Sequence, residues 1–400
     1  MTRILRNISG DRTIWAIVAL LAIFSFLPVY SASTNLVGVV GKGTTLGYLL
    51  KHAVLLVLGF VIIYATHKIP YRYFSGLSVL LIPVVLVLLI YTLYQGNTIS
   101  GINASRWISI PFVGIGFQTS TLASVVVMMY LARYLAKNKE NKIDFKESVL
   151  QLWLPVGIIM ALILPANFST TAIIFSMVLI ISFLGGYPIK YLGAIIGVGL
   201  LILVLFILTA KAFPDTFKNS RIETWSNRIE NFSNPGEEEN YQAEKAKLAI
   251  ASGEIKGKGP GKSIQKNFLP QSSSDFIYAI IVEEFGLIGG IVLLLLFLGL
   301  LFRIVIVATK TETIFGTLLV LGVGVPIIFQ ALINMAVAVG LFPVTGQPLP
   351  LISAGGTSIW MTCFAIGIIL SVSAVREEKI DAEKKKNDDN PLNILYETIG

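Results

Sequence analysis

The chain has 400 residues, of which 54% are hydrophobic and only 14% are charged. Soluble domains carry about 25% charged residues, so this composition excludes an ordinary soluble protein and indicates a chain embedded in lipid. The net charge of +8 is typical of lysines and arginines that set topology in short loops, and we expect no nucleic-acid partner. One cysteine, Cys363, and two histidines exclude a disulfide framework and a histidine-rich metal site.

Ten apolar segments follow one another along the chain, each about as long as a membrane-spanning helix or slightly shorter. Because a span needs about 20 mostly apolar residues, we predict an all-α integral membrane protein with about ten transmembrane helices. The expected helices are Thr13–Ser31, Leu46–Ala65, Phe74–Tyr94, Phe112–Leu135, Val149–Leu164, Thr170–Leu184, Leu192–Phe213, Phe276–Phe302, Ile314–Gly340 and Ser358–Val375. No small-residue cleavage site follows the first segment, so we interpret it as a retained helix.

Basic residues are distributed unequally between alternate loops. With the N-terminus in the cytoplasm, the cytoplasmic segments include the basic stretches 137–146 and 376–386. The short outer segments contain only Lys42 and Arg106. Because positively charged loops stay on the cytoplasmic side, the sequence predicts a multi-pass protein of the cell inner membrane with both termini in the cytoplasm.

One long polar segment, residues 214–275, separates the seventh and eighth predicted helices. We assign it to the extracytoplasmic side, since long loops cross the membrane whatever their charge, and loops of this length are usually functional. Within it, residues 221–232 and 241–251 have the pattern of short amphipathic helices. The chain thus divides into a polytopic membrane domain, residues 1–376, and a polar cytoplasmic tail, residues 377–400, which we expect to be disordered.

The acidic residues on the predicted outer face all lie in this long loop. Asp275 differs from the others because it directly precedes a hydrophobic helix. An aspartate at this position suits a helix cap, whose carboxylate accepts hydrogen bonds from the first amides of the helix. Partial burial at the membrane edge would instead suit a general base, and spacing alone leaves both interpretations open.

Two further acids, Glu283 and Glu284, fall two turns inside the same predicted helix. A charge at lipid depth is costly unless it is paired or hydrated. We therefore expect both to face the bundle interior or a helix interruption near Gly286. An internal salt bridge or polar network explains them at least as well as catalysis does.

The usual motifs of nucleotide-binding and hydrolytic enzymes are absent, since the sequence contains no G-x-S-x-G, no Walker loop and no H-E-x-x-H. The outer basic residues available to bind an anionic lipid diphosphate include Arg106, Lys258 and Lys266. For Arg106, which precedes Trp107, anchoring at the membrane surface is an equally good interpretation.

Three blocks of residues resemble the SEDS family of membrane proteins (shape, elongation, division and sporulation). The blocks are Arg106–Ile108 with Gln118 and Ser120; Gly257–Lys266 with Leu269–Pro270, Asp275–Ala279, Glu283–Glu284 and Gly286; and Phe329–Gln330 with Asn334, Gly340–Gly346, Leu349–Pro350, Ser353, Gly355–Gly356 and Ser358. Together they cover the chain from about residue 100 to residue 376. The pair Gln265–Lys266 makes the chain more similar to the division branch of the family than to the elongation branch.

The resemblance implies a ten-helix peptidoglycan glycosyltransferase that polymerises lipid II, the undecaprenyl-diphosphate-linked disaccharide pentapeptide, on the outer face of the membrane. It implies that Asp275 is the catalytic residue, and that a class B penicillin-binding transpeptidase and other divisome proteins are partners. The residues predicted to bind substrate are Arg106, Lys258, Ser263, Gln265, Lys266, Glu283, Thr345 and Ser353. A divalent cation, magnesium or manganese, is the one cofactor left open; we predict no organic cofactor and assign no metal ligand.

Two departures from the family pattern lie at the predicted outer membrane edge. Members commonly have an acid and a lysine where this chain has Thr121 and Ser124, and P-D-x-G-T where this chain has Ala166–Thr170. An ion pair or metal ligand at those positions does not carry over to this chain. Two other functions therefore stay open: a lipid II flippase, and a non-catalytic scaffold that activates the transpeptidase.

Overall fold

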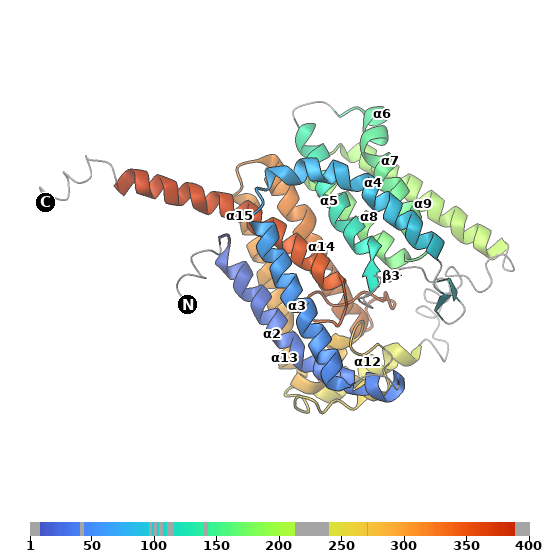
Figure 1. Cartoon of the computed structure of the whole chain (residues 1–400). Coiled ribbons are helices and arrows are strands. Elements are labelled where there is room, and N and C mark those ends of the chain that lie inside the picture. The colour runs from blue at the N-terminus through green and yellow to red at the C-terminus, as the bar shows by residue number, and fades with distance from the viewer. Residues whose placement is uncertain are drawn as a thin grey trace, which may run out of the picture.

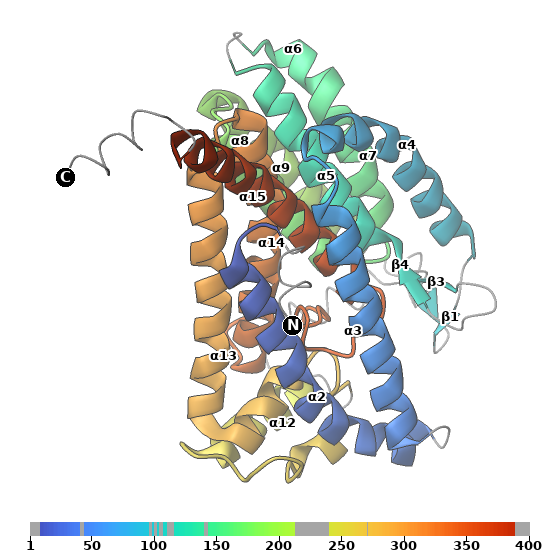
Figure 2. The same ribbon diagram turned by 60° about the vertical axis from the view of Figure 1, so that its left-hand side comes forward.

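The computed structural model describes residues 9–40, 44–95, 98–99, 102–103, 107–109, 116–139, 143–212, 240–269 and 271–388. In these residues the chain is a bundle of long apolar helices with a few short strands at one side, below α4 and α5 in Figure 2 (Figures 1 and 2). Arg106 and the predicted helix at residues 221–232 lie outside the described residues.

Most of the helices correspond to the predicted apolar segments. The long helices are α2 (Arg12–Val40), α3 (Thr45–His67), α4 (Arg72–Gln95), α5 (Thr119–Lys137), α7 (Leu154–Ile163), α8 (Phe168–Leu184), α9 (Ile189–Ala212), α13 (Ile277–Thr309), α14 (Ile314–Ala338) and α15 (Ser358–Asp388). The shorter elements are α6 (Phe145–Ser148), the π-helical turn η1 (Val149–Trp153), α12 (Asn240–Gly253), the 3-10 turn η2 (Gln265–Asn267), β1 (Thr98–Ile99), β2 (Ile102–Asn103), β3 (Trp107–Ser109) and β4 (Gly116–Gln118).

Eight spans in the described part of the chain are long and apolar enough to cross a membrane, with α6, η1 and α7 counted as one span, Phe145–Ile163. Two shorter apolar helices, Phe168–Leu184 and Ile189–Ile202, bring the number to ten. Each overlaps one predicted segment, so the prediction of a ten-helix, all-α, multi-pass membrane protein is confirmed. Sequence predicts such helices well because lipid forces every backbone amide of a span to bond within its own segment.

Helix α14 lies at the centre of the bundle and packs against α5, α8, α13 and α15, whereas α3 packs along α15. The core between these helices is filled by apolar side chains such as Met128, Phe297 and Leu319. Helix α9 is peripheral, since it packs on α8 and exposes side chains such as Leu200 and Leu201. A helix that is apolar on all sides belongs in a membrane, so these side chains face lipid.

The structure differs from the predicted boundaries at two places. The helix predicted to start at Phe112 begins only at Thr119, because residues 116–118 pair with 107–109 in an antiparallel hairpin. At the other end, the tail that we expected to be disordered from residue 377 is helical as far as Asp388, where α15 ends. Its alanines, glutamates and lysines are strong helix formers. In Figure 2, α12 lies at the opposite end of the bundle from α6 and the last turns of α15.

Candidate functional site

The helix that follows the long loop is interrupted. Gly286 in α13 has φ 70° and ψ −174°, a conformation that is essentially restricted to glycine. The segment before α13 bonds to the backbone groups that the interruption leaves unpaired. The amide of Lys258 donates to the carbonyl oxygen of Glu283 at 3.0 Å, and that of Gly259 donates to the carbonyl oxygen of Glu284 at 2.9 Å. The predicted interruption near Gly286 is therefore confirmed.

The carboxylate of Glu283 is fully buried and surrounded by donors. Lys258 forms an ion pair with it at 2.8 Å, and the hydroxyl of Ser263 donates to it at 2.5 Å. The backbone amides of Ile264 and Gln265 donate to it at 3.1 and 3.2 Å. A buried charge is tolerated when it is both paired and hydrogen-bonded, and Glu283 meets both conditions. This arrangement is the internal polar network that the sequence left as one of two explanations.

Glu284 belongs to an adjoining network. Its carboxylate accepts hydrogen bonds from the hydroxyl of Ser31 in α2 and, at 3.3 Å, from the amide of Ser263. The ammonium group of Lys266 donates to the Ser31 hydroxyl at 3.1 Å and to the carbonyl oxygen of Gly261 at 2.9 Å. These hydrogen bonds thus connect helix α2, the loop before α13 and α13 itself.

Five of the predicted substrate-binding residues meet in these two networks. They are Lys258, Ser263, Gln265, Lys266 and Glu283. The structure brings them together, and their polar groups bond to one another across the loop and α13. This geometry indicates that they hold the loop against the first turns of α13, with Asp275 just before those turns.

Removing the cation from the first network should destabilise the protein. In Lys258→Met, the buried Glu283 carboxylate loses its ion-pair partner, at a cost of about 3 kcal/mol for a buried pair. Adding Glu283→Gln should recover part of the loss, because it removes the uncompensated charge. Lys262→Met changes an exposed lysine of the same loop and should leave the unfolding midpoint unchanged. Thermal unfolding of the three purified variants measures these effects. Equal unfolding midpoints for Lys258→Met and the unaltered protein would contradict a stabilising role of this network.

Asp275 is half-buried directly before α13. The N-cap position of the helix is Phe276, which makes no side-chain capping bond. Asn334 of α14 donates to the carbonyl oxygen of Asp275 at 2.8 Å, and the amide of Asp275 donates to the carbonyl oxygen of Gln271 at 3.2 Å. The N-cap position thus falls one residue after Asp275, and the base and cap interpretations of its carboxylate both stay open.

A second loop holds the backbone beside Asp275. The hydroxyl of Ser353, which is almost completely buried, donates to the carbonyl oxygen of Ser274 at 2.5 Å. The amide of Ala354 donates to the carbonyl oxygen of Ser273 at 2.9 Å. Ser353, which we predicted to bind substrate, therefore supports the loop that carries Asp275.

Asn334 is a residue of this site to which the sequence assigned no role. It is buried, and its side-chain amide also donates to the carbonyl oxygen of Gln347 at 2.8 Å. The Gln347 side chain in turn donates to the hydroxyl of Thr170 in α8 at 2.8 Å. A lone asparagine within an apolar helix is a recognisable signal for such a role, because its amide must find partners at lipid depth.

An apolar groove of about 430 Å³ lies between α8 and α14. The loop that follows α14, with the predicted residue Thr345, lines part of it. Ile333 and Val344 line the groove and also pack against the small apolar cluster that contains Phe276. The groove therefore reaches the neighbourhood of Asp275.

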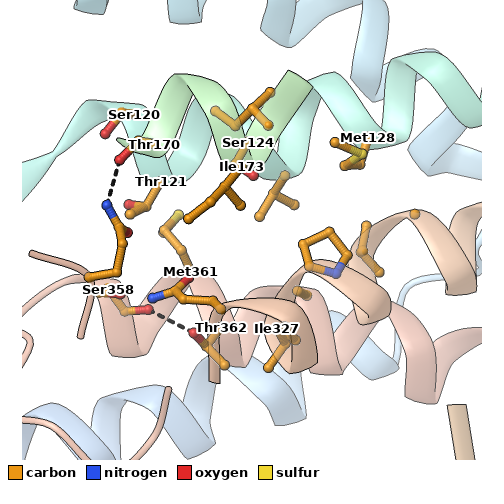
Figure 3. A pocket seen from close by; sticks show the side chains of 18 residues that line it. Ser120, Thr121, Ser124, Met128, Thr170, Ile173, Ile327, Ser358, Met361 and Thr362 are labelled. Atoms are coloured by element: carbon orange, nitrogen blue, oxygen red, sulfur yellow. Dashed lines mark hydrogen bonds between the residues drawn. The ribbon is translucent and has the colours of Figure 1, made fainter. Parts of the chain in front are cut away.

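A smaller cavity of about 60 Å³ lies between α5, α8, α14 and α15 (Figure 3). Thr121 and Ser124, which stand where the family commonly has an acid and a lysine, line it together with Thr170 and Thr362. None of its lining residues is charged. The cavity has room for about four to six water molecules, and its neutral hydroxyls suit water better than a divalent cation, which prefers carboxylates. Among the described residues, no group of three or more histidine, cysteine or acidic side chains is placed to hold a metal ion.

Fold and site together define a multi-pass helical membrane protein in which a long loop folds against an interrupted helix. Residues 11–378 match the FtsW/RodA/SpoVE family, described as cell cycle proteins. The chain belongs to this family, which is the SEDS family that its sequence motifs resemble.

Two relatives illustrate the similarity. The probable peptidoglycan glycosyltransferase FtsW of Hydrogenovibrio crunogenus is 32% identical over 378 residues, which cover 92% of this chain and 94% of that protein. The protein of the same name from Geobacter metallireducens is 33% identical over 366 residues, which cover 91% of this chain and 94% of that protein. Both carry the name of the division protein, in agreement with the branch that Gln265–Lys266 favours.

Solved structures have the same fold. One is a peptidoglycan synthase complex, described as coordinating polymerization and crosslinking; the match has a TM-score of 0.71 and 25% identity, and covers 92% of this chain and 98% of that chain. The rod shape determining protein RodA of Thermus thermophilus matches with a TM-score of 0.64 and 24% identity, over 91% of this chain and 96% of that chain.

Proposed function

We propose that this chain is a peptidoglycan glycosyltransferase of the FtsW type, which polymerises lipid II on the outer face of the inner membrane during septal cell-wall synthesis. The single observation that carries the proposal is the place of Asp275. This half-buried residue ends a loop that hydrogen bonds hold in place, and an apolar groove between two spans reaches its neighbourhood through Ile333 and Val344. A lipid-linked sugar needs this combination of a base at the membrane edge and an apolar channel for the tail.

The reaction that fits this site is a single inverting displacement. The 4-hydroxyl oxygen of the incoming lipid II sugar attacks the anomeric carbon of the growing chain, and the bond to the lipid diphosphate breaks. Asp275 accepts the proton of the attacking hydroxyl, and the diphosphate leaves with the electron pair of the broken bond. General-base assistance of this kind contributes about 10² to 10⁴ in rate. A diphosphate is a good leaving group, so no covalent intermediate is needed.

The prenyl tail of one substrate would lie in the groove between α8 and α14. The groove side chains are almost all apolar, among them Phe168, Phe329 and Leu332. The peripheral position of α9 supports this assignment, because a helix that packs only loosely beside α8 leaves the groove accessible from lipid. A polyisoprenoid chain in such a groove exchanges one apolar environment for another, so binding depends on the headgroup for most of its specificity.

The developing charge on the diphosphate requires cations. Lys258 and Lys266, which we predicted for this role, are engaged with Glu283 and with Ser31. Their proposed contribution is therefore to position the loop. Arg106 remains the proposed direct partner of the diphosphate, with a divalent cation, magnesium or manganese, as a second source of positive charge.

The proposal includes an orientation and a partner. Both termini lie in the cytoplasm, which is supported by the basic loops and by the position of α12 at the opposite end of the bundle from the last turns of α15. The partner is a class B penicillin-binding transpeptidase within the divisome, which crosslinks the strands made by this chain. The similarity to a peptidoglycan synthase complex supports such an assembly.

A lipid II flippase is the second candidate, and the polar cavity shown in Figure 3 is the feature that would favour it. The hydroxyls of Ser120, Thr121 and Thr170 line one part of the cavity, but farther along the helices it is lined by Met128 and Val323. The polar lining thus gives way to apolar side chains within the bundle. A flippase needs a hydrophilic route for a charged headgroup, so this geometry favours the polymerase.

One experiment separates the two functions. The purified chain is reconstituted into vesicles that carry lipid II, and both glycan strands and transfer of lipid II between leaflets are measured. The polymerase proposal predicts strands that depend on Asp275 and no faster transfer than in empty vesicles. Rapid transfer that survives Asp275→Asn, without strands, would establish the flippase. A scaffold would give neither product, and its Asp275→Asn form would still support division in cells.

A further inference from the structure

The loop between α14 and α15 contributes to the apolar groove and to the Asp275 site at the same time. Its first part, residues 342–345, lines the groove together with side chains of α8. Two residues farther on, the carbonyl oxygen of Gln347 accepts a hydrogen bond from the Asn334 side chain at 2.8 Å. The same Asn334 amide donates to the carbonyl oxygen of Asp275, also at 2.8 Å. One buried side chain therefore holds both a wall of the groove and the backbone of the candidate base.

The side chain of Gln347 connects this loop to the other wall of the groove. Its amide donates to the hydroxyl of Thr170 in α8 at 2.8 Å, a bond drawn as the dashed line at Thr170 in Figure 3. Thr170 lies between Ser169 and Ala172, which line the groove. Gln347 and Thr170 are only 6% and 7% exposed, so little water competes for this bond. A lipid tail in the groove thus contacts both of the segments that the bond joins.

The later part of the loop is fixed against the segment that carries Asp275. Leu351 has φ 63°, and Gln271, in the loop before α13, has φ 59°. Residues other than glycine rarely adopt this conformation, which persists only where the surrounding structure imposes it. Ser353 and Ala354 bond to the carbonyl oxygens of the two residues before Asp275. A displacement of the first part of the loop is therefore transmitted to Asp275 rather than absorbed on the way.

We propose that Gln347 and Asn334 are positioning residues, which make the catalytic rate depend on the prenyl tail in the groove. The inference rests on the proposed function, because it takes the groove as the site of the tail and Asp275 as the base. A tail that fills the groove supports both walls, and the two amide side chains carry that support to Asp275. Binding energy from a remote part of a substrate then serves to orient the reacting groups, so a truncated substrate loses kcat and not only affinity.

Steady-state polymerisation by the purified full chain measures this dependence. Two substrates carry the same lipid II headgroup. One has the undecaprenyl tail, and the other has a single isoprene unit, which cannot fill a groove of about 430 Å³. In the unaltered protein, kcat for the short-tailed substrate should be about tenfold lower, because a small misplacement of a catalytic group already slows a reaction.

Two nearly isosteric variants remove the bond between the walls. Gln347→Met loses the side-chain amide but keeps the carbonyl that Asn334 holds, and Thr170→Val loses the hydroxyl. In both variants, kcat for the undecaprenyl substrate should fall about tenfold, and kcat for the short-tailed substrate should not change. Thr170→Ser keeps the hydroxyl and should keep the tail dependence. Because Thr170→Val alters the side-chain volume little, it provides a folded variant if Gln347→Met does not accumulate.

Gln151→Met is the matched control. Gln151 is exposed, and its side chain bonds to Glu147 one turn earlier. This variant should retain both the kcat and the tail dependence of the unaltered protein. A merely structural role of Gln347 would lower kcat for both substrates by the same factor, and that result would overturn the proposal. An unaltered protein with the same kcat for both tails would overturn it as well, as would a loss of tail dependence in Gln151→Met.

Amide hydrogen exchange separates this proposal from the proposed function, because it requires no turnover. Exchange in residues 273–279 is followed in nanodiscs with undecaprenyl diphosphate and with dimethylallyl diphosphate. Undecaprenyl diphosphate should slow exchange in the unaltered chain but not in Gln347→Met, and dimethylallyl diphosphate should slow it in neither. If this result is found and the unaltered chain makes no glycan strands, the positioning role stands and the polymerase assignment fails. Equal slowing in both proteins, with strands formed, would overturn the positioning role alone.

Discussion

Gly286→Ala should lower the unfolding temperature strongly or prevent the protein from accumulating in the membrane. A methyl group at this position would lie 2.2 Å from the carbonyl oxygen of Ile255, which is far inside contact distance. The φ of 70° with ψ of −174° adds backbone strain for any residue with a side chain. Together these effects should cost at least about 3 kcal/mol. The loop and the interrupted helix cannot both keep their positions, so the networks around Glu283 and Glu284 should also be lost.

Gly157→Ala is the matched control. Gly157 lies in α7, and a methyl group there meets no heavy atom within 4 Å. Replacing a helical glycine that has open space beside it by alanine stabilises a helix by about 1 kcal/mol, so this variant should unfold at the same temperature or slightly higher. Thermal unfolding in detergent compares the two. If Gly286→Ala unfolds at the same temperature as Gly157→Ala, the loop is not packed into the interruption of α13.

Asp275→Asn should reduce the rate of lipid II polymerisation by about 10² to 10⁴ while the protein stays folded. Asparagine keeps the size of the side chain and both backbone hydrogen bonds, those from Asn334 and to Gln271. The change removes the negative charge of the side chain and its ability to accept a proton. The effect should therefore fall on kcat, with KM little changed, as expected for a group that acts in the transition state.

Ser274→Ala serves as the neighbouring control for this prediction. Among the described residues the Ser274 hydroxyl bonds to Gln271 alone, while the interaction with Ser353 uses the backbone carbonyl. This variant should retain the activity of the unaltered protein within about threefold. A loss in Ser274→Ala equal to that in Asp275→Asn would mean that the loop conformation, rather than the carboxylate, accounts for the effect.

The spans were the most predictable part of the molecule. Their apolar length is a local property, and the predicted segment Leu46–Ala65 became α3 with boundaries shifted by one residue at the start and two at the end. The interruption at Gly286 was also foreseeable, since two buried acids followed by glycines conflict with a regular helix in lipid. The predicted start of a helix was wrong where pairing between two separate segments determines the structure, as in the hairpin of residues 107–109 and 116–118.

The candidate site was less predictable because its contacts connect segments far apart in sequence. The ion pair between Lys258 and Glu283 could not be predicted from sequence, because it forms only when the loop folds onto α13. No role could be assigned to Asn334 from sequence, because its hydrogen bond to the carbonyl oxygen of Asp275 joins two segments far apart in the chain. The place of Asp275 was indicated by the family pattern, and spacing alone did not distinguish a base from a cap.

The most direct test of the proposed activity uses purified lipid II and the purified chain together with its class B transpeptidase partner. The products are separated by gel electrophoresis after a fixed time. The polymerase proposal predicts a ladder of glycan strands with the unaltered chain, and lipid II left as monomer with Asp275→Asn. Monomeric lipid II with the folded, unaltered complex, or an identical ladder from Asp275→Asn, would contradict it.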